Sequence, residues 1–134
     1  MWSAVGRRRP AATTALGRAL LAFRATDRSA MGWYAAAAGD ESPFPVSQDS
    51  LWETLQATRA RGYATETEEN EPGISCLAVP LLRAGQAVAA LSVTAPADRM
   101  DRDRHRELAR IVRSVAPPLL PSSLTVPGEL GTIS

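Results

Sequence analysis

The sequence predicts an α/β (α+β) domain in which a small, largely antiparallel sheet is flanked by helices. The chain has 134 residues, which is the length of one domain, and its 45% hydrophobic and 22% charged residues are ordinary for a globular protein. Apolar residues recur at helical spacing near both ends of the chain. Between them, two apolar segments separated by a short turn are typical of a hairpin. The expected order of elements is α-α-α-β-β-β-α.

Three helices are expected in the first half of the chain, after a lead-in over residues 1–12 that holds the triplet Arg7-Arg8-Arg9. The first helix begins after the capping pair Thr13-Thr14 and carries apolar residues near one face. The second begins at residue 26 or 27 and stops at Gly39. The third stops at Gly62, after basic residues that suit a helix C-terminus. Its candidate N-caps are Ser47, Asp49 and Ser50.

Three strands and a last helix are expected in the second half. The strands cover residues 63–66, 74–82 and 86–94. The last helix runs from an N-cap at Asp101 to Val115. Its apolar residues fall at positions i, i+3, i+4 and i+7, which predicts a stripe facing the core: Leu108, Ile111, Val112 and Val115. Pro117-Pro118 ends it, so we expect a domain over residues 13–116 and a disordered, proline-containing tail over 117–134.

The turn between the two longer strands decides which side chains share a face of the sheet. A two-residue turn at Ala84-Gly85 would pair Cys76 with Val93 and send Ser92 to the other face. A three-residue loop that includes Arg83 would instead pair Cys76 with Ser92 and Ile74 with Thr94. We predict the three-residue loop, because only this register gathers Cys76, Ser92 and Thr94 on one face.

Composition excludes several classes of function. Cys76 is the single cysteine and His105 the single histidine, so the chain has no internal disulfide and no Cys-rich or two-histidine metal site. The formal net charge of +1 is low for a domain that binds nucleic acid by itself. No apolar run approaches the length of a membrane span, and the N-terminus lacks the order of a signal peptide. We expect a cytoplasmic protein without membrane contact.

Several short segments of the sequence match those of a known family in their order and spacing. They are Arg59-Ala60-Arg61-Gly62-Tyr63-Ala64, Glu68-Glu69, the run from Gly73 to Pro80, and the run from Val88 to Pro96. Upstream, the run from Pro10 to Ala22 is similar to the helix that opens the family's ligand cleft. On the basis of these segments, residues 5–116 resemble the C-terminal effector-binding domain of IclR-type bacterial transcription regulators.

The resemblance implies a GAF-like domain that binds a small effector, often a carboxylic acid or an aromatic compound, and that mediates oligomer formation. In the family this domain follows a winged helix-turn-helix. The DNA-binding part and the first strands of the effector domain are absent here, so the chain looks like an N-terminally truncated member. The family's pocket positions fall on Glu66, Cys76, Ser92 and Thr94, with backbone N–H groups of Ala15 and Leu16. The sequence departs from the family pattern at Glu66 (usually Asp), Thr94 (usually Ser) and Ala95 (usually Gly), and each change narrows the pocket.

Three functions remain open, and the first is preferred. The chain is an effector-binding and oligomerisation module, or a truncated remnant that at most associates with full-length regulators, or, least favoured, a Cys-dependent enzyme. We predict no enzymatic activity and no cofactor, because His105, the only candidate base, is expected on the solvated side of the last helix. Partners would be a small organic acid or an aromatic effector, and either further copies of the chain or a full-length regulator.

Some conspicuous residues also have ordinary structural explanations. The acidic residues between Glu66 and Glu71 are interpreted as a solvated loop and not as a cation site. The aromatic residues Trp33, Tyr34 and Trp52 are expected to be helix core contacts, with an interface role as the alternative. Gly17 indicates close packing or a ligand contact in the first helix.

Overall fold

The computed structural model describes residues 11–24, 27–38 and 46–128. The predicted class and order of elements are confirmed: α1 (Ala15–Ala22), α2 (Met31–Ala38), α3 (Gln48–Arg61), β1 (Ala64–Thr67), β2 (Ile74–Arg83), β3 (Gln86–Pro96) and α4 (Arg102–Val115). Short 3-10 turns join them: η1 (Ala11–Thr13), η2 (Arg28–Ala30), η4 (Ala97–Arg99) and η5 (Pro117–Leu119). The triplet Arg7-Arg8-Arg9, Thr26 and Gly39 lie outside the described residues.

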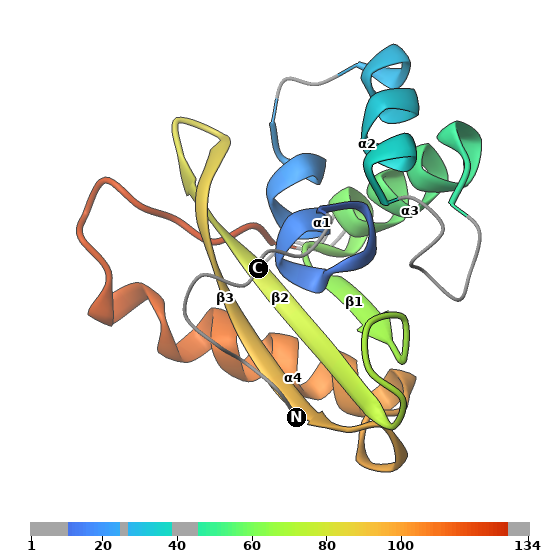
Figure 1. Cartoon of the computed structure of the whole chain (residues 1–134). Helices are drawn as coiled ribbons and strands as arrows, with labels where there is room; N and C mark the ends of the chain where they lie inside the picture. The colour runs from blue at the N-terminus through green and yellow to red at the C-terminus, as the bar shows by residue number, and fades with distance from the viewer. Residues whose placement is uncertain (1–10, 25–26, 39–45, 129–134) are drawn as a thin grey trace, which may run out of the picture.

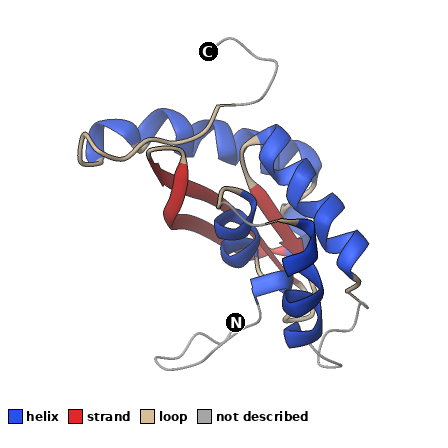
Figure 2. Cartoon of the chain, turned by 90° about the horizontal axis from the view of Figure 1, so that it is seen from above, coloured by secondary structure: helices blue, strands red, loops and turns tan. Residues whose placement is uncertain are grey.

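The described strands form one antiparallel sheet in the order β1-β2-β3. Helix α1 covers one face, and α4 runs across the opposite face (Figures 1 and 2). Helices α2 and α3 pack on the outer side of α1, around Met31, Leu51 and Leu55. The sheet is therefore the middle layer, and α1 is held between it and the α2–α3 pair.

The local signals at the helix ends agree with the structure. Ser47 is the N-cap of α3, and its side chain and that of Ser50 bond each other's backbone N–H in a capping box. Gly62 ends α3 with φ 87°, a left-handed conformation that favours glycine. Asp101 caps α4 as predicted. Asp27 caps η2, which leads directly into α2.

The β2–β3 hairpin closes differently from the prediction. Arg83 pairs with Gln86, so the connection is the two-residue turn Ala84-Gly85 and not a three-residue loop. Both turn residues have positive φ, 52° and 78°, as a type I′ turn requires. The register then shifts, because Val88 is an extra residue on β3 and forms a bulge.

Because of the bulge, Cys76, Ser92 and Thr94 share one face of the sheet as predicted, but their cross-strand partners differ from the prediction. Cys76 pairs with Thr94, and Ser92 pairs with Ala78, so the predicted pairs Cys76–Ser92 and Ile74–Thr94 are wrong. One extra residue on a strand reverses which face the following side chains occupy. Ser92 and Thr94 therefore still share a face with Cys76. Reasoning from the turn alone missed the bulge, because nothing at Val88 marks it in the sequence.

The chain beyond residue 116 is part of the fold, although a disordered tail was expected. After η5 it returns to the sheet, where Thr125 exchanges two backbone hydrogen bonds with Leu82, at 2.8 and 2.9 Å. Val126 packs on the hydrophobic cluster beneath α4, and Pro127 is buried. Prolines without periodicity thus mark an ordered irregular segment here, at least to residue 128.

Two further expectations about packing need correction. Ile111 and Val115 of the predicted α4 stripe are 46% and 55% exposed, and only Leu108 and Val112 pack on the core. Tyr34 and Trp52 contact the α1–α3 cluster as expected, but Trp33 is 70% exposed and touches Tyr34 edge-on. No described helix has the length and apolar character needed to cross a membrane.

Candidate functional site

The first turn of α1 supplies the backbone part of the site. Thr14 is the N-cap, and its hydroxyl accepts a 3.0 Å hydrogen bond from the N–H of Gly17. The N–H groups of Ala15 and Leu16 belong to the first turn, where no carbonyl of the same helix can accept from them. Such a turn favours an anion. Ala15 is buried against the sheet, whereas Leu16 is 42% exposed.

Gly17 lets this turn form. A Cβ at Gly17 would lie 2.4 Å from the Cα and carbonyl oxygen of Ala11, so a larger residue would displace η1. Of the two explanations offered for this glycine, the structure shows close packing. The N-terminus of α1 is thereby fixed against the segment that precedes it.

The sheet supplies the side chains of the site. Ala64, Cys76 and Ala78 pack in the alanine-rich cluster beneath α1, so this is the face that α1 covers. Glu66 is opposite Cys76, which is opposite Thr94, and Ser92 is one pair further along. Alternation therefore places Glu66, Cys76, Ser92 and Thr94 on the α1 face.

The four side chains differ in exposure and contact. Cys76 Sγ and Thr94 Oγ1 are 3.3 Å apart. Glu66 is buried, Cys76 is half-buried, and Ser92 and Thr94 are exposed at the outer strand. Within the described residues, the exposure of these side chains therefore increases from β1 towards β3.

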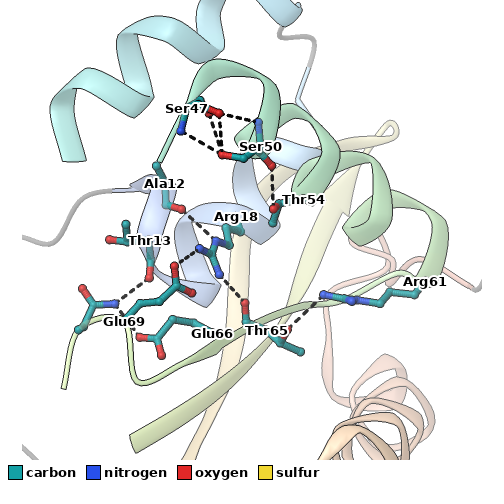
Figure 3. A network of polar contacts seen from close by, with 11 residues as sticks. Ala12, Thr13, Arg18, Ser47, Ser50, Thr54, Arg61, Thr65, Glu66 and Glu69 are labelled. Carbon is teal, nitrogen blue, oxygen red and sulfur yellow. Dashed lines mark hydrogen bonds and ion pairs between the residues drawn. The ribbon is translucent and has the colours of Figure 1, made fainter. Parts of the chain in front are cut away.

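Glu66 is the most constrained member of the site, at 4% exposure. Its Oε1 accepts a 2.6 Å hydrogen bond from Asn70 Nδ2, which also donates to the Thr13 carbonyl at 2.7 Å (Figure 3). Its Oε2 is buried and has no hydrogen-bond partner within the described part of the chain. Burial raises the pKa of Glu66, against the hydrogen bonds from Asn70 and from the Glu69 backbone, which lower it. The carboxyl group is thus held beside the start of α1 with one oxygen unmatched.

Arg18 is a structural residue that the sequence reasoning missed. Its guanidinium donates to the Ala12 carbonyl at 2.9 Å, to the Thr65 carbonyl at 2.8 Å and to Glu69 Oε1 at 2.6 Å (Figure 3). These bonds join η1, β1 and the loop after it. The helical position of Arg18 could have predicted its burial, because it lies three residues after Ala15 and one before Ala19, on the buried face of α1. Asn70 had no comparable signal, because an asparagine in a polar loop is usually a turn residue.

Cys76 is unsuited to nucleophilic chemistry here. Burial raises the pKa of its thiol, although the Thr94 hydroxyl opposes this, so the neutral thiol is favoured. His105 lies on the other face, where its Nε2 is 3.2 Å from the Oγ of Ser75, the strand neighbour of Cys76. The expectation that His105 is solvated is wrong, since it is 8% exposed, and burial lowers its pKa. Among the described residues, no group of three or more His, Cys, Asp or Glu could hold a metal ion.

Comparisons with known proteins agree with this architecture. The family model described as "Bacterial transcriptional regulator IclR C-terminal" matches residues 1–119. The HTH-type transcriptional regulator KdgR of Escherichia coli is 33% identical over 119 residues, which are 87% of this chain and 45% of that protein. The crystal structure of the E. coli KdgR C-terminal domain has a TM-score of 0.69 and 31% identity, over 83% of this chain and 69% of that one.

A third similar protein was solved with a small molecule. It is a double mutant of the inducer binding domain of the PobR transcription factor from Acinetobacter, in complex with 3-hydroxybenzoic acid. Its TM-score is 0.69 at 30% identity, and the match covers 85% of this chain and 67% of that one. This chain spans less than half the length of the curated KdgR that it matches.

The fold and the family match identify a domain of a bacterial transcription regulator. The chain belongs to the IclR family and corresponds to its C-terminal, effector-binding domain. Because the family and these relatives are transcriptional regulators, the prediction of a non-enzymatic protein is confirmed. The matched range begins within the predicted lead-in and ends three residues beyond residue 116.

Proposed function

We propose that this chain senses a small organic acid, of the aromatic or short-chain class, for an IclR-type transcription regulator. One observation carries the proposal: the N-terminus of α1 lies beside the buried Glu66 carboxyl group, whose Oε2 has no hydrogen-bond partner in residues 11–24, 27–38 and 46–128. An orphaned buried acceptor is costly unless a ligand satisfies it.

Each group has a separate task in this proposal. The N–H groups of Ala15 and Leu16 meet the ligand carboxylate at the helix N-terminus. The hydroxyls of Ser92 and Thr94 and the neutral Cys76 thiol supply further polar contacts. Glu66 Oε2 accepts a hydrogen bond from a ligand hydroxyl. The PobR domain bound to 3-hydroxybenzoic acid shows that a relative of this fold accommodates a hydroxy acid.

Effector binding would act by population shift. An effector that binds one arrangement of associated subunits better than another changes their equilibrium, and with it the spacing of attached DNA-binding domains. We propose that the chain takes part through subunit association and does not itself contact DNA, consistent with its net charge of +1. As part of a regulator of transcription it would work in the cytoplasm.

Thermal unfolding with 3-hydroxybenzoate and with benzoate tests the site. A ligand that binds only the native state stabilises it by RT ln(1 + [L]/Kd), about 2.7 kcal/mol at a hundredfold excess over Kd. We expect 3-hydroxybenzoate, or another acid from a panel of hydroxy acids, to raise the Tm. Thr94→Val should abolish the shift because it removes the hydroxyl at constant shape. Thr125→Val, on an exposed residue that pairs through its backbone, is the matched control.

The remnant hypothesis gives the contrary outcome. Glu66 and Thr94 are each larger than the usual family residue, and a site filled by its own side chains would bind no acid. A cooperative melt that no member of the panel shifts would therefore reject the sensor proposal.

A further inference from the structure

The α4 face of the sheet carries a polar contact that the candidate site does not use. Ser75 of β2 is fully buried there, and its Oγ lies 3.2 Å from His105 Nε2 of α4. The same Oγ donates to the Glu66 carbonyl at 3.0 Å and lies 3.2 Å from Thr67 Oγ1. Glu66 is therefore shared between the two faces, because its side chain lies in the candidate site while its carbonyl belongs to this contact.

The register of β1 and β2 explains why these groups meet. Glu66 is opposite Cys76, and Thr67 is opposite Ser75. A ladder hydrogen bond of 2.8 Å lies two positions beyond the Glu66–Cys76 pair, so by alternation the Cys76 N–H donates to the Glu66 carbonyl. Thr67 and Ser75 then form a non-hydrogen-bonded pair, in which side chains lie closer together. The Glu66 carbonyl thus receives two donors, the Cys76 amide and the Ser75 hydroxyl.

The single hydrogen of the Ser75 hydroxyl fixes the direction of each bond. It goes to the Glu66 carbonyl, so Ser75 accepts from His105, whose neutral ring must carry its hydrogen on Nε2. The Thr67 hydroxyl offers Ser75 a second acceptor, since either oxygen of that pair can donate. Ser75 therefore has two arrangements. The bond from His105 favours the one directed at Glu66, because it holds the Ser75 oxygen from the α4 side.

Protonation of His105 opposes this contact. His105 is 8% exposed, and a cation there would be buried near the charge of Arg61 at the end of α3 and near the N-terminus of α4. Asp101, the N-cap of α4, offsets part of this cost. The groups that face the ring from the strands, Ser75 and Thr67, are uncharged. We therefore expect the charged ring to leave Ser75 for solvent.

We propose that the His105–Ser75 contact transmits the charge state of His105 through the sheet to Glu66, so that protonation of His105 loosens the candidate effector site. Neutral His105 holds the Ser75 hydroxyl on the Glu66 carbonyl. Charged His105 releases this hydroxyl to Thr67, and the Glu66 carbonyl keeps only its ladder bond. The consequence for effector affinity rests on the proposed function, whereas the link between His105 and Glu66 is measured without an effector.

The chain offers two unique reporters of this link, because it has one histidine and one cysteine. Labelling with ¹⁵N-cysteine gives a single amide signal, from the Cys76 N–H that faces the Glu66 carbonyl. In an NMR titration from pH 7.5 to pH 5, this signal should follow the His105 ring with the same midpoint. Ser75→Ala and His105→Gln should each remove that inflection. Ser114→Ala, which removes a hydroxyl from the exposed side of α4, should keep it.

Three results overturn the inference. A wild-type Cys76 amide that ignores the His105 titration is one, and a His105 ring that does not titrate before the chain unfolds is another. The third is an inflection at the His105 midpoint that persists in Ser75→Ala, because the charge then acts through space. Circular dichroism checks that the variants fold, and the wild-type titration is decisive by itself if the amide stays unchanged.

Binding of 3-hydroxybenzoate measures the functional consequence. Between pH 7.5 and pH 5.5 its affinity should fall about fivefold more for wild type than for His105→Gln. This variant keeps a donor for Ser75, and the comparison cancels the titration of Glu66 and of the ligand. An equal fall in the two chains overturns the inference. A Cys76 amide that follows His105 in a chain that binds no acid rejects the proposed function and supports the link between the two faces.

Discussion

The two faces of the sheet are packed in different ways. Beneath α1 the buried contacts are alanines: Ala15, Ala19, Ala64 and Ala78. Beneath α4 most of them are larger: Tyr63, Leu77, Val79 and Met100 pack there with Ala109. Small side chains let α1 lie close to the strands and leave space for polar groups such as Glu66, whereas the α4 face buries more apolar surface. The candidate site therefore lies on the α1 face of the sheet, whereas the α4 face provides most of the hydrophobic stabilisation.

The largest effect should come from the α4 face. Leu77 is fully buried there, and Leu77→Ala should cost about 2–5 kcal/mol of unfolding free energy through lost transfer energy and a cavity. Urea unfolding of the variant measures this. Val88→Ala, at a residue 45% exposed, should change stability by less than about 0.5 kcal/mol. Equal losses in both variants would contradict the assignment of the core to this face.

Arg18 makes the α1 face depend on polar bonds. Arg18→Leu should destabilise the chain by about 2–3 kcal/mol, because two carbonyls and the mostly buried Glu69 lose a charged donor. Arg104→Leu is the matched control. It breaks an exposed 3.0 Å pair with Glu107 and should cost less than about 0.5 kcal/mol in the same urea titration. If the two arginine variants are equally stable, the network in Figure 3 contributes nothing.

Glu66 gives the α1 face a characteristic pH dependence. The pKa of Glu66 is raised in the folded state, so the folded chain holds its proton more tightly than the unfolded chain. The stability it contributes is complete below the ordinary value of 4.5 and is lost as the pH rises through the folded pKa. Glu66→Gln should therefore be more stable than wild type at pH 7 and no more stable at pH 4. A constant difference across this range would show that ionisation is not the cause.

His105 should give the α4 face the opposite dependence. Its pKa is lowered by burial and by the charge of Arg61, so stability is lost as the pH falls below the ordinary value of 6.5. His105→Gln should remove this loss between pH 6.5 and 5, as followed by Tm, while keeping a donor for Ser75. A wild-type Tm that is flat in that window would reject the assignment.

The smallest effect on stability is expected in the Ala84-Gly85 turn, which connects β2 and β3. Ala84 has φ 52°, which costs an alanine strain that glycine does not have. Ala84→Gly should stabilise the chain by about 0.5 kcal/mol, and Ala84→Asn, which suits a type I′ turn, by a similar amount. Differential scanning calorimetry of the three chains measures the change. A destabilised Ala84→Asn would argue against the type I′ assignment.

Local signals in the sequence predicted most of the fold. Ser47, Gly62 and Asp101 mark helix ends through bonds made within a few residues, so their roles follow from the sequence. The hairpin register could not be predicted, because the Val88 bulge depends on how β3 meets β2. His105 was misplaced for a similar reason: its neighbours in sequence are charged, but its side chain reaches Ser75, thirty residues away.

The sequence by itself determined the class of domain, the order of its elements and the family residues that mark the candidate site. Only the tertiary structure decided that Arg18 and Asn70 link the segments around this site, and that one Glu66 oxygen is buried without a partner among the described residues. The physical reason is the distance along the sequence over which each interaction acts. Caps, turns and periodicity act over a few residues of chain, whereas burial and strand neighbours are set by segments that are distant in sequence and meet only when the chain folds.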